Sequence, residues 1–414
     1  MTHADPILSI VIPTRNREHY AVASVRSILR IPSPRLELVV QDSSDSNALK
    51  KLIDSNISDS RLRYNYSKPP VNAVENFNKA VALATGEYVC FIGDDDGVNP
   101  EIMLAALWAK ANDLDAVRPD MVATYFWPDI QAHAGLEGRA GKLFIQKFSG
   151  AITFPVADIE ARKCVRNAAL DYLGTDLPKI YHGLVRKKCL DEVKLLAGEH
   201  FKGLSPDIFG ALAVSLFVTR MCAIDYPLTI GGTSILSGAG DSAAGKHKGR
   251  LEEAPQLRER SDYRWDELIP RFYSVQTIWA ETAVVALRAT NRRDLLKEFN
   301  LPLLYAQCMI FHFDFARVIL SNMPRAFRST GRNYLKGSAE FLFYATTIPI
   351  KRAMNSLAYR IRARISRNVH EIGGLATIED AADSLAAYLA SNNHRFDSLK
   401  GVPGDEAQRR HSNE

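Results

Sequence analysis

Three consecutive aspartates, Asp94 to Asp96, directly follow an apolar run that ends at Ile92 and Gly93. Like charges this close together are costly unless a cation lies between them. Oxygen ligands favour a hard ion such as Mg²⁺ or Mn²⁺, which usually completes its shell with water and substrate phosphates. The triplet therefore predicts a divalent-metal site, with a cluster of aspartates that merely caps a turn as the alternative.

The chain before these aspartates alternates short apolar runs with helical patterns. Strands that alternate with helices predict a parallel sheet with crossover helices, and ligands bind at the carboxyl ends of such strands. We therefore expect the polar turns after the strands to meet at one edge of the sheet. The expected strands are 8–13, 36–40, 62–66 and 88–92, and the expected helices are 20–29, 48–53 and 72–84.

The signals weaken after residue 100, where helices are expected at 162–173, 187–196 and 206–218. A glycine-rich stretch follows, and from about residue 253 the pattern is almost wholly helical, clearest at 302–320 and 378–391. Three parts are expected: an α/β domain over 1–252, a helical region over 253–400 and a flexible tail over 401–414.

The composition is that of a folded globular protein, with 46% hydrophobic and 24% charged residues among 414. It excludes a disordered, collagen-like or coiled-coil chain. Five dispersed cysteines without a C-x-x-C pair favour a reducing compartment over disulfides or a zinc site. The first residues do not resemble a signal peptide, and no window reaches the roughly 18 uninterrupted apolar residues of a spanning helix. A cytoplasmic protein is expected.

The net charge of +5 conceals a strongly basic segment. Residues 317–367 contain eleven lysines and arginines and a single acid, Glu340. Such an excess, interleaved with apolar residues, predicts a surface that meets the phosphates of lipid or nucleic acid. A solvated helical face, or an apolar stripe packed on the protein or in a homodimer, would leave the same pattern. The recurring positions are Leu357, Ile361 and Ile365 beside Arg360, Arg362 and Arg364.

Three segments together resemble a known family. They are LSIVIPTRNR at 8–17, LVVQDSSDS at 38–46 and NAVENFNKAVALATGEYVCFIGDDDGVNPE at 72–101. In this order and spacing they look like the nucleotide-binding half of a family 2 glycosyltransferase of the GT-A fold, similar to bacterial polysaccharide-biosynthesis enzymes. The resemblance extends over roughly residues 7–250. It implies a Rossmann-like, mostly parallel central sheet flanked by helices, followed here by a mainly α-helical region.

The resemblance also implies a donor site for a nucleoside-diphosphate sugar. Pro13, Thr14 and Arg15 would line the nucleotide, and Asp42 would hydrogen-bond the base. The family commonly has Asp-Asp-Gly-Ser at the second motif, whereas this chain has Gln41-Asp42-Ser43-Ser44, so the base contact depends on Asp42 alone. A sugar nucleotide needs a polar acceptor for its base, hydroxyl binders and a cation, and residues of these types occur in that order.

At the metal turn, the family often has an acid where this chain has Gly93. The resemblance therefore makes Asp95 and Asp96 the expected ligands of Mg²⁺ or Mn²⁺, while Asp94 would face the ribose. His247 resembles a late histidine that reaches the metal or the phosphates in many such enzymes. Its basic neighbours Lys246, Lys248 and Arg250 could offset charge on the leaving diphosphate, or they could form an ordinary solvated loop.

Asp207 is the expected general base. In an inverting transfer a carboxylate removes the proton of the acceptor hydroxyl as it attacks the anomeric carbon. Ser205-Pro206-Asp207 looks like a variant of the acidic pair that the family has at this point. The same three residues are also an ideal helix start, with serine as the cap, proline in the first position and aspartate favouring the dipole.

The expected function is therefore metal-dependent, inverting transfer of a sugar to a hydroxyl of a glycan or lipid-linked acceptor. An anionic surface on the cytoplasmic face of the membrane and a second copy of the chain are further candidate partners, and nucleic acid is not expected. The competing interpretation is a non-catalytic scaffold, or a protein that binds nucleic acid or another anionic surface through segment 317–367.

Overall fold

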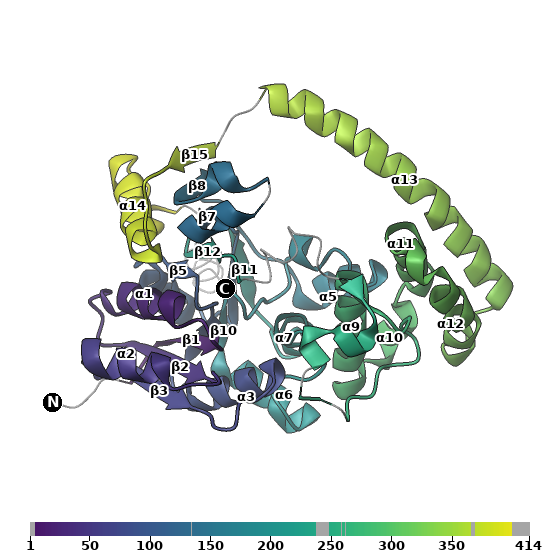
Figure 1. Ribbon diagram of the computed structural model, residues 1–414, viewed down its shortest axis with the longest axis horizontal. Helices are drawn as coiled ribbons and strands as arrows, with labels where there is room; N and C mark the ends of the chain where they lie inside the picture. Colours follow the sequence, from purple (N-terminus) through teal and green to yellow (C-terminus); the bar gives the residue numbers. More distant parts are fainter. Residues whose placement is uncertain are drawn as a thin grey trace, which may run out of the picture.

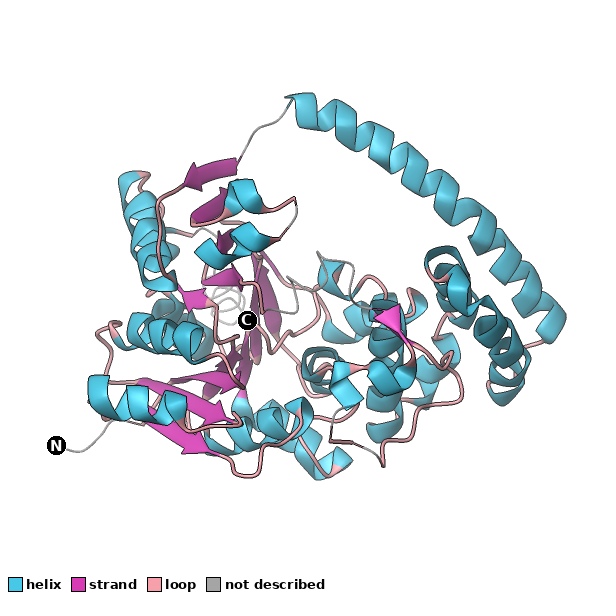
Figure 2. Ribbon diagram, viewed as in Figure 1, coloured by secondary structure: helices cyan, strands magenta, loops and turns pink. Residues whose placement is uncertain are grey.

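The computed structural model describes residues 5–133, 135–236, 248–257, 259–260, 262–365 and 369–399. An eight-stranded sheet lies at the centre of the α/β part, with helices around it and a five-stranded sheet beside it (Figures 1 and 2). In spatial order the large sheet contains β3 (Leu62–Tyr66), β2 (Leu36–Asp42), β1 (Leu8–Thr14), β4 (Tyr88–Phe91), β10 (Leu184–Arg186), β6 (Ala116–Pro119), β11 (Met221–Ile224) and β9 (Ile152–Thr153).

The first four strands form the parallel half of this sheet. β1 pairs in parallel with both β2 and β4, and β2 pairs in parallel with β3. Val11 and Val39 pack in one core with α3 (Ala73–Leu83), whereas Ile10 packs in a second core with α1 (Glu18–Leu29) and α2 (Ala48–Asn56). Because both faces are covered, β1, β2 and β4 are almost wholly buried and their sequences are mainly apolar, whereas the edge strand β3 is polar and only partly buried. The predicted mostly parallel, helix-flanked sheet is confirmed.

The second sheet brings a later strand against the aspartate turn. Its order is β15 (Val369–Ile372), β8 (Lys142–Gln146), β7 (Ala123–Phe126), β12 (Thr229–Thr233) and β5 (Gly97–Val98). β5 follows Asp96 directly and pairs antiparallel with β12. A Cβ atom on Gly232 would lie 1.9 Å from the carbonyl oxygen of Asp95, so only glycine allows this close approach.

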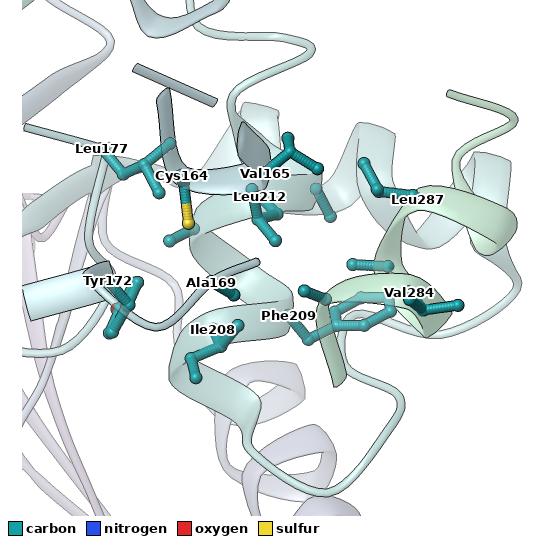
Figure 3. Packing of buried hydrophobic residues seen from close by; sticks show 14 of the residues in the cluster. Cys164, Val165, Ala169, Tyr172, Leu177, Ile208, Phe209, Leu212, Val284 and Leu287 are labelled. Atoms are coloured by element: carbon teal, nitrogen blue, oxygen red, sulfur yellow. The ribbon is translucent and has the colours of Figure 1, made fainter. Parts of the chain in front are cut away.

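The helical region shares a core with the α/β part. Figure 3 shows Cys164 and Val165 of α5 (Ala157–Arg166), Phe209 and Leu212 of α7 (Pro206–Val214), and Val284 of α9 (Val275–Ala289) in one cluster. The predicted boundary at 252/253 therefore does not divide two separate cores. The other helices are α4 (Ile102–Ala111), α6 (Lys187–Ala197), α10 (Arg293–Glu298), α11 (Leu301–Phe311), α12 (Ala316–Ser329), α13 (Tyr334–Ile365) and α14 (Ile378–Ser391).

After α13 the chain returns to the α/β part. Figure 1 shows α13 spanning from α12 to β15, which pairs antiparallel with β8. α14 lies beside α1, where Arg30 Nη2 is 2.9 Å from Asp383 Oδ2. Residues 369–399 therefore pack on the α/β part, although the sequence assigned them to the helical region. The predicted helix over 302–320 is two helices, α11 and α12.

No single helix in the described ranges has the length and apolar character needed to cross a membrane. Leu301–Phe311 and Phe313–Ser329 meet these two criteria only together, as a pair bent by 113°.

Candidate active site

The three aspartates lie at the carboxyl end of β4 and are buried, between 2% and 4% exposed. Asp96 accepts hydrogen bonds from the backbone: the N–H groups of Gly93 and Gly232 each donate to its carboxylate at 2.6 Å. The Tyr181 hydroxyl donates to Asp96 Oδ2 at 3.1 Å, and His182 Nε2 lies 3.2 Å from the same oxygen. Asp96 therefore ties β4, β12 and the segment before β10 together.

Arg17 lies between the other two aspartates. Its Nη1 is 2.7 Å from Asp94 Oδ1, and its Nη2 is 2.7 Å from Asp95 Oδ2. Thr14 Oγ1 donates to Asp94 Oδ2 at 2.5 Å, and Ser234 Oγ donates to Asp95 Oδ2 at 2.7 Å. The sequence assigned no role to Arg17. Its place in the same turn as Thr14 and Arg15, at the strand end that faces Asp94, is the signal that could have identified it.

The electrostatics of the triplet follow from burial and from these partners. Burial raises the pKa of Asp94 to about 7, and Asp95 adds to the rise, while the charge of Arg17 opposes it. Burial and the neighbouring Asp96 raise the pKa of Asp95. Burial also acts to raise the pKa of Asp96, but His182 and the backbone N–H donors outweigh it and lower that pKa. One guanidinium therefore compensates this group of carboxylates incompletely.

A cavity of about 410 Å³ opens beside the turn. Pro13, Thr14, Arg15 and Asp94 line it together, and their contacts with a nucleotide stay a prediction. Arg15 also pairs with Asp45 and Glu259 at its rim. A neighbouring cavity of about 700 Å³ shares two of its lining residues. Further lining residues of the first cavity are Asn16, Arg17, Ser43, Asn72, Asn76, Phe77, Gly93, Tyr181 and Glu259.

Asp42 is fully buried behind this cavity. Its Oδ1 accepts from the backbone N–H of Ser44 at 2.8 Å, and its Oδ2 accepts from the Tyr64 hydroxyl at 2.6 Å. Ser43 is the residue of this turn that lines the cavity. A hydrogen bond from Asp42 to a base stays a prediction, and in this structure the carboxylate orders the turn instead.

Asp207 lies at the start of α7, in a different environment from the triplet. Ser205 occupies the N-cap position of α7, but its side chain accepts no hydrogen bond from the helix backbone, and its hydroxyl donates to Asp207 Oδ1. Burial raises the pKa of Asp207, and Ser205 and the nearby Lys179 oppose the rise. Tyr172 donates to the Asp207 backbone carbonyl at 3.3 Å. No arginine or lysine lies in salt-bridge contact with this carboxylate within the described residues.

The predicted phosphate-binding loop is described only in part. Lys246 and His247 lie outside the described residues. Lys248 is exposed and its Nζ is 3.3 Å from Asp314 Oδ2, and Arg250 is exposed with Nε 3.8 Å from Glu252. The two residues therefore stand on the surface with acidic neighbours, and their roles toward phosphate stay predictions.

The chemistry of the donor set fits a divalent ion in part. Within the described ranges, no three His, Cys, Asp or Glu side chains converge in a way that could hold a metal. Asp94 and Asp95 supply carboxylate oxygens to one place, and Mg²⁺ is commonly bound by one or two carboxylates together with substrate phosphates. The pair thus suits a metal that arrives with a diphosphate, provided that Arg17 gives way.

The first third of the chain is similar in sequence to known glycosyl transferases. The family model described as "Glycosyl transferase family 2" matches residues 9–133. The putative colanic acid biosynthesis glycosyl transferase WcaA of Escherichia coli is 32% identical over 98 residues, which are 23% of this chain and 35% of WcaA. The GalNAc(5)-diNAcBac-PP-undecaprenol beta-1,3-glucosyltransferase of Campylobacter jejuni is 32% identical over 113 residues, 26% of this chain and 35% of that enzyme.

This chain thus matches about a third of the length of these curated relatives. Among solved structures, S. aureus TarS 1-349 in complex with UDP-GlcNAc is similar with a TM-score of 0.43 and 15% identity, over 79% of this chain and 93% of that one. The resemblance expected from the motifs is confirmed over residues 9–133, which match the family 2 glycosyl transferase model.

Proposed function

We propose that this protein transfers a sugar from a nucleoside-diphosphate sugar to a hydroxyl of a glycan or lipid-linked acceptor. The observation that carries the proposal is the cavity lined by Pro13 to Arg17 and Asp94, because it lies at the carboxyl ends of β1 and β4 within the segment that matches the family. Open α/β sheets bind ligands at this edge.

The donor side of the reaction falls to the turn after β1 and to the aspartates. The β1 turn and Ser43 would contact the nucleoside, and Arg15 would exchange its carboxylate partners for phosphate. The sequence predicted Asp95 and Asp96 as metal ligands and Asp94 as a ribose contact. Because backbone N–H groups engage Asp96, we propose instead that Asp94 and Asp95 would hold a Mg²⁺ or Mn²⁺ ion, whose charge would stabilise the diphosphate as leaving group. Asp96 would keep the turn in place through its backbone hydrogen bonds.

The acceptor side falls to Asp207. In an inverting transfer its carboxylate would accept the proton of the acceptor hydroxyl during attack on the anomeric carbon. Burial raises its pKa, which makes the carboxylate a stronger base than an exposed aspartate. Within the described residues the carboxylate has no salt-bridge partner that would compete with a proton for its charge, although Ser205 donates to its Oδ1.

Two similar enzymes support the class of acceptor. The Campylobacter jejuni relative is named for a PP-undecaprenol substrate, and WfgD of Escherichia coli for alpha-D-GlcNAc-diphosphoundecaprenol. We propose a lipid-linked acceptor and peripheral association with the cytoplasmic face of a membrane. On α13, Leu335, Leu342, Phe343 and Ile350 are exposed, and Lys336, Lys351 and Arg352 are exposed on the same helix. The predicted contacts of Leu357 to Ile365 fall outside the described side chains.

Calorimetry with UDP and GDP, with and without Mn²⁺, tests the donor proposal. Binding that requires the divalent ion supports it, and failure of every nucleoside diphosphate to bind refutes it. If the protein instead binds nucleic acid with a steep dependence on salt, the competing interpretation holds. If a nucleoside diphosphate binds, a screen of sugar nucleotides for hydrolysis would identify the donor.

Liposome flotation tests the membrane proposal. Binding to anionic but not neutral vesicles, weakened by salt, supports it. Leu342→Ser with Phe343→Ser should reduce binding, whereas Leu195→Ser, at an exposed leucine of α6, should not. If the α13 variant binds vesicles as well as the wild type does, this face is assigned to packing with a second copy. The same assignment follows if the protein self-associates and binds neither lipid type.

A further inference from the structure

We propose that Arg17 and the divalent ion are alternative cations for one pair of carboxylates, Asp94 and Asp95, and that the donor's diphosphate decides between them. The inference rests on the proposed function. It concerns which cation neutralises the two carboxylates: Arg17 does so when no metal is bound, and the metal and nucleoside diphosphate replace it jointly.

The first step is the geometry of the guanidinium. Its two terminal nitrogens each lie 2.7 Å from a different aspartate, so one planar group spans the pair. Nη2 also donates to Ser234 Oγ at 2.6 Å, and the Tyr20 ring lies 5.2 Å from the guanidinium carbon. A divalent ion that bridged Asp94 and Asp95 would require the same oxygens and would be repelled by the guanidinium.

The second step is the cost of an uncompensated pair. The side chains of Asp94 and Asp95 are only 3% and 5% exposed, so water cannot replace a lost cation. Removing one partner of a buried ion pair leaves a charge without compensation, which is strongly destabilising. Arg17 should therefore leave only when another cation arrives.

The third step is where Arg17 can go. Arg17 lines the cavity beside Asp94, and its side chain is 18% exposed, so the guanidinium borders the space assigned to the donor. Arg17 Nε is buried and has no hydrogen-bond partner among the described residues, and the contact of Asp94 Oδ1 with Arg17 Nη1 is an ion pair without hydrogen-bond geometry. A diphosphate offers a guanidinium strong, bidentate acceptors. The diphosphate of the donor would thus bind Arg17 when the metal binds Asp94 and Asp95.

This exchange predicts cooperative binding of metal and nucleotide. Mn²⁺ binding by the full chain should be weak without nucleotide and should tighten when UDP or GDP is present. Electron paramagnetic resonance of free Mn²⁺ and calorimetry measure both states. Arg17→Gln should tighten Mn²⁺ binding in the absence of nucleotide by about tenfold, and should reduce the tightening produced by the nucleotide.

Arg26→Gln is the matched control, because Arg26 is an exposed arginine of α1, the helix whose N-cap residue is Arg17. It should leave Mn²⁺ affinity unchanged. Arg17→Lys provides a second test if the glutamine variant does not fold, since a lysine keeps the charge but cannot span both carboxylates as a planar fork. It should tighten Mn²⁺ binding to a smaller extent.

Mn²⁺ affinity that is equal in wild type and both Arg17 variants would overturn the competition, as would equally tight Mn²⁺ binding by the wild type with and without nucleotide. Absence of Mn²⁺ binding in every variant would overturn it as well. The nucleotide-free titration is independent of the donor: loss of all nucleotide binding refutes the proposed function, whereas tightening in Arg17→Gln without nucleotide still supports the competition at this pair.

Discussion

The aspartate turn after β4 and the start of α7 place carboxylates in opposite environments. Asp94 and Asp95 share the guanidinium of Arg17, and Asp96 accepts two backbone N–H donors. Asp207 has only the Ser205 hydroxyl as a side-chain hydrogen-bond donor within the described residues, and burial raises its pKa. Carboxylates that already pair with a cation suit the binding of a metal ion. A carboxylate without a salt-bridge partner suits proton transfer.

The largest expected effect separates the two environments directly. Asp207→Asn should lower kcat by about two to four orders of magnitude, because the amide cannot accept the proton of the acceptor hydroxyl. Affinity for the nucleoside diphosphate should hardly change. Steady-state kinetics together with calorimetry measure both quantities. Substantial remaining activity would reassign Asp207 to its role at the helix start.

Within the triplet, Asp96 should differ from its neighbours. Asp96→Ala leaves the N–H groups of Gly93 and Gly232 and the hydroxyl of Tyr181 without their acceptor. We expect it to lower the free energy of unfolding by about 3 kcal/mol, measured by urea denaturation. A variant as stable as wild type that loses only metal binding would return Asp96 to the ligand role that the sequence assigned to it.

Asp95→Ala should instead abolish divalent-dependent nucleotide binding while the fold is kept. Asp95 contacts Arg17 and Ser234 through one oxygen, and Arg17 retains Asp94 when Asp95 is removed. Calorimetry with UDP and Mn²⁺ measures the loss, and circular dichroism checks the fold. Wild-type affinity in this variant would show that Asp95 is not a metal ligand.

The pH dependence of stability should report the protonation of Asp94. Because the pKa of Asp94 is raised to about 7 in the folded state, the folded protein binds more protons at this residue than the unfolded chain between the ordinary aspartate range and about pH 7. Stability of the metal-free protein should therefore fall as pH rises from the ordinary aspartate range toward about 7. Protons and metal compete for the carboxylate, so the increase in Tm caused by Mn²⁺ with UDP should be larger at about pH 8 than at about pH 5.5. An equal increase at both pH values would contradict this assignment.

The smallest expected effect concerns Lys179. Its Nζ donates to the Leu173 carbonyl at 2.8 Å and lies 5.3 Å from the centre of the Tyr172 ring, and its charge lowers the pKa of Asp207. Lys179→Met should move the acidic limb of the pH profile of kcat upward by less than about one unit. Lys188→Met, at an exposed lysine, is the control. A profile that falls in overall rate without moving would indicate a purely structural role.

Much of the first hundred residues was predictable from local patterns. The expected strand 62–66 is β3 (Leu62–Tyr66), and the expected helix 72–84 is α3 (Ala73–Leu83). Asn72 caps that helix by accepting from the N–H of Glu75 at 3.1 Å. Farther along, the pattern over 302–320 did not reveal the break between α11 and α12, because both halves are apolar enough to continue one helix.

The sequence by itself determined the order of strands and helices through β4, the positions of the polar turns and the family resemblance, because periodicity, caps and motifs are properties of neighbouring residues. Only the tertiary structure decided that Arg17 bridges Asp94 and Asp95, that Gly232 and His182 engage Asp96, and that β15 rejoins β8. These contacts join residues far apart in the chain, and their partners are fixed by sheet order and register rather than by local pattern.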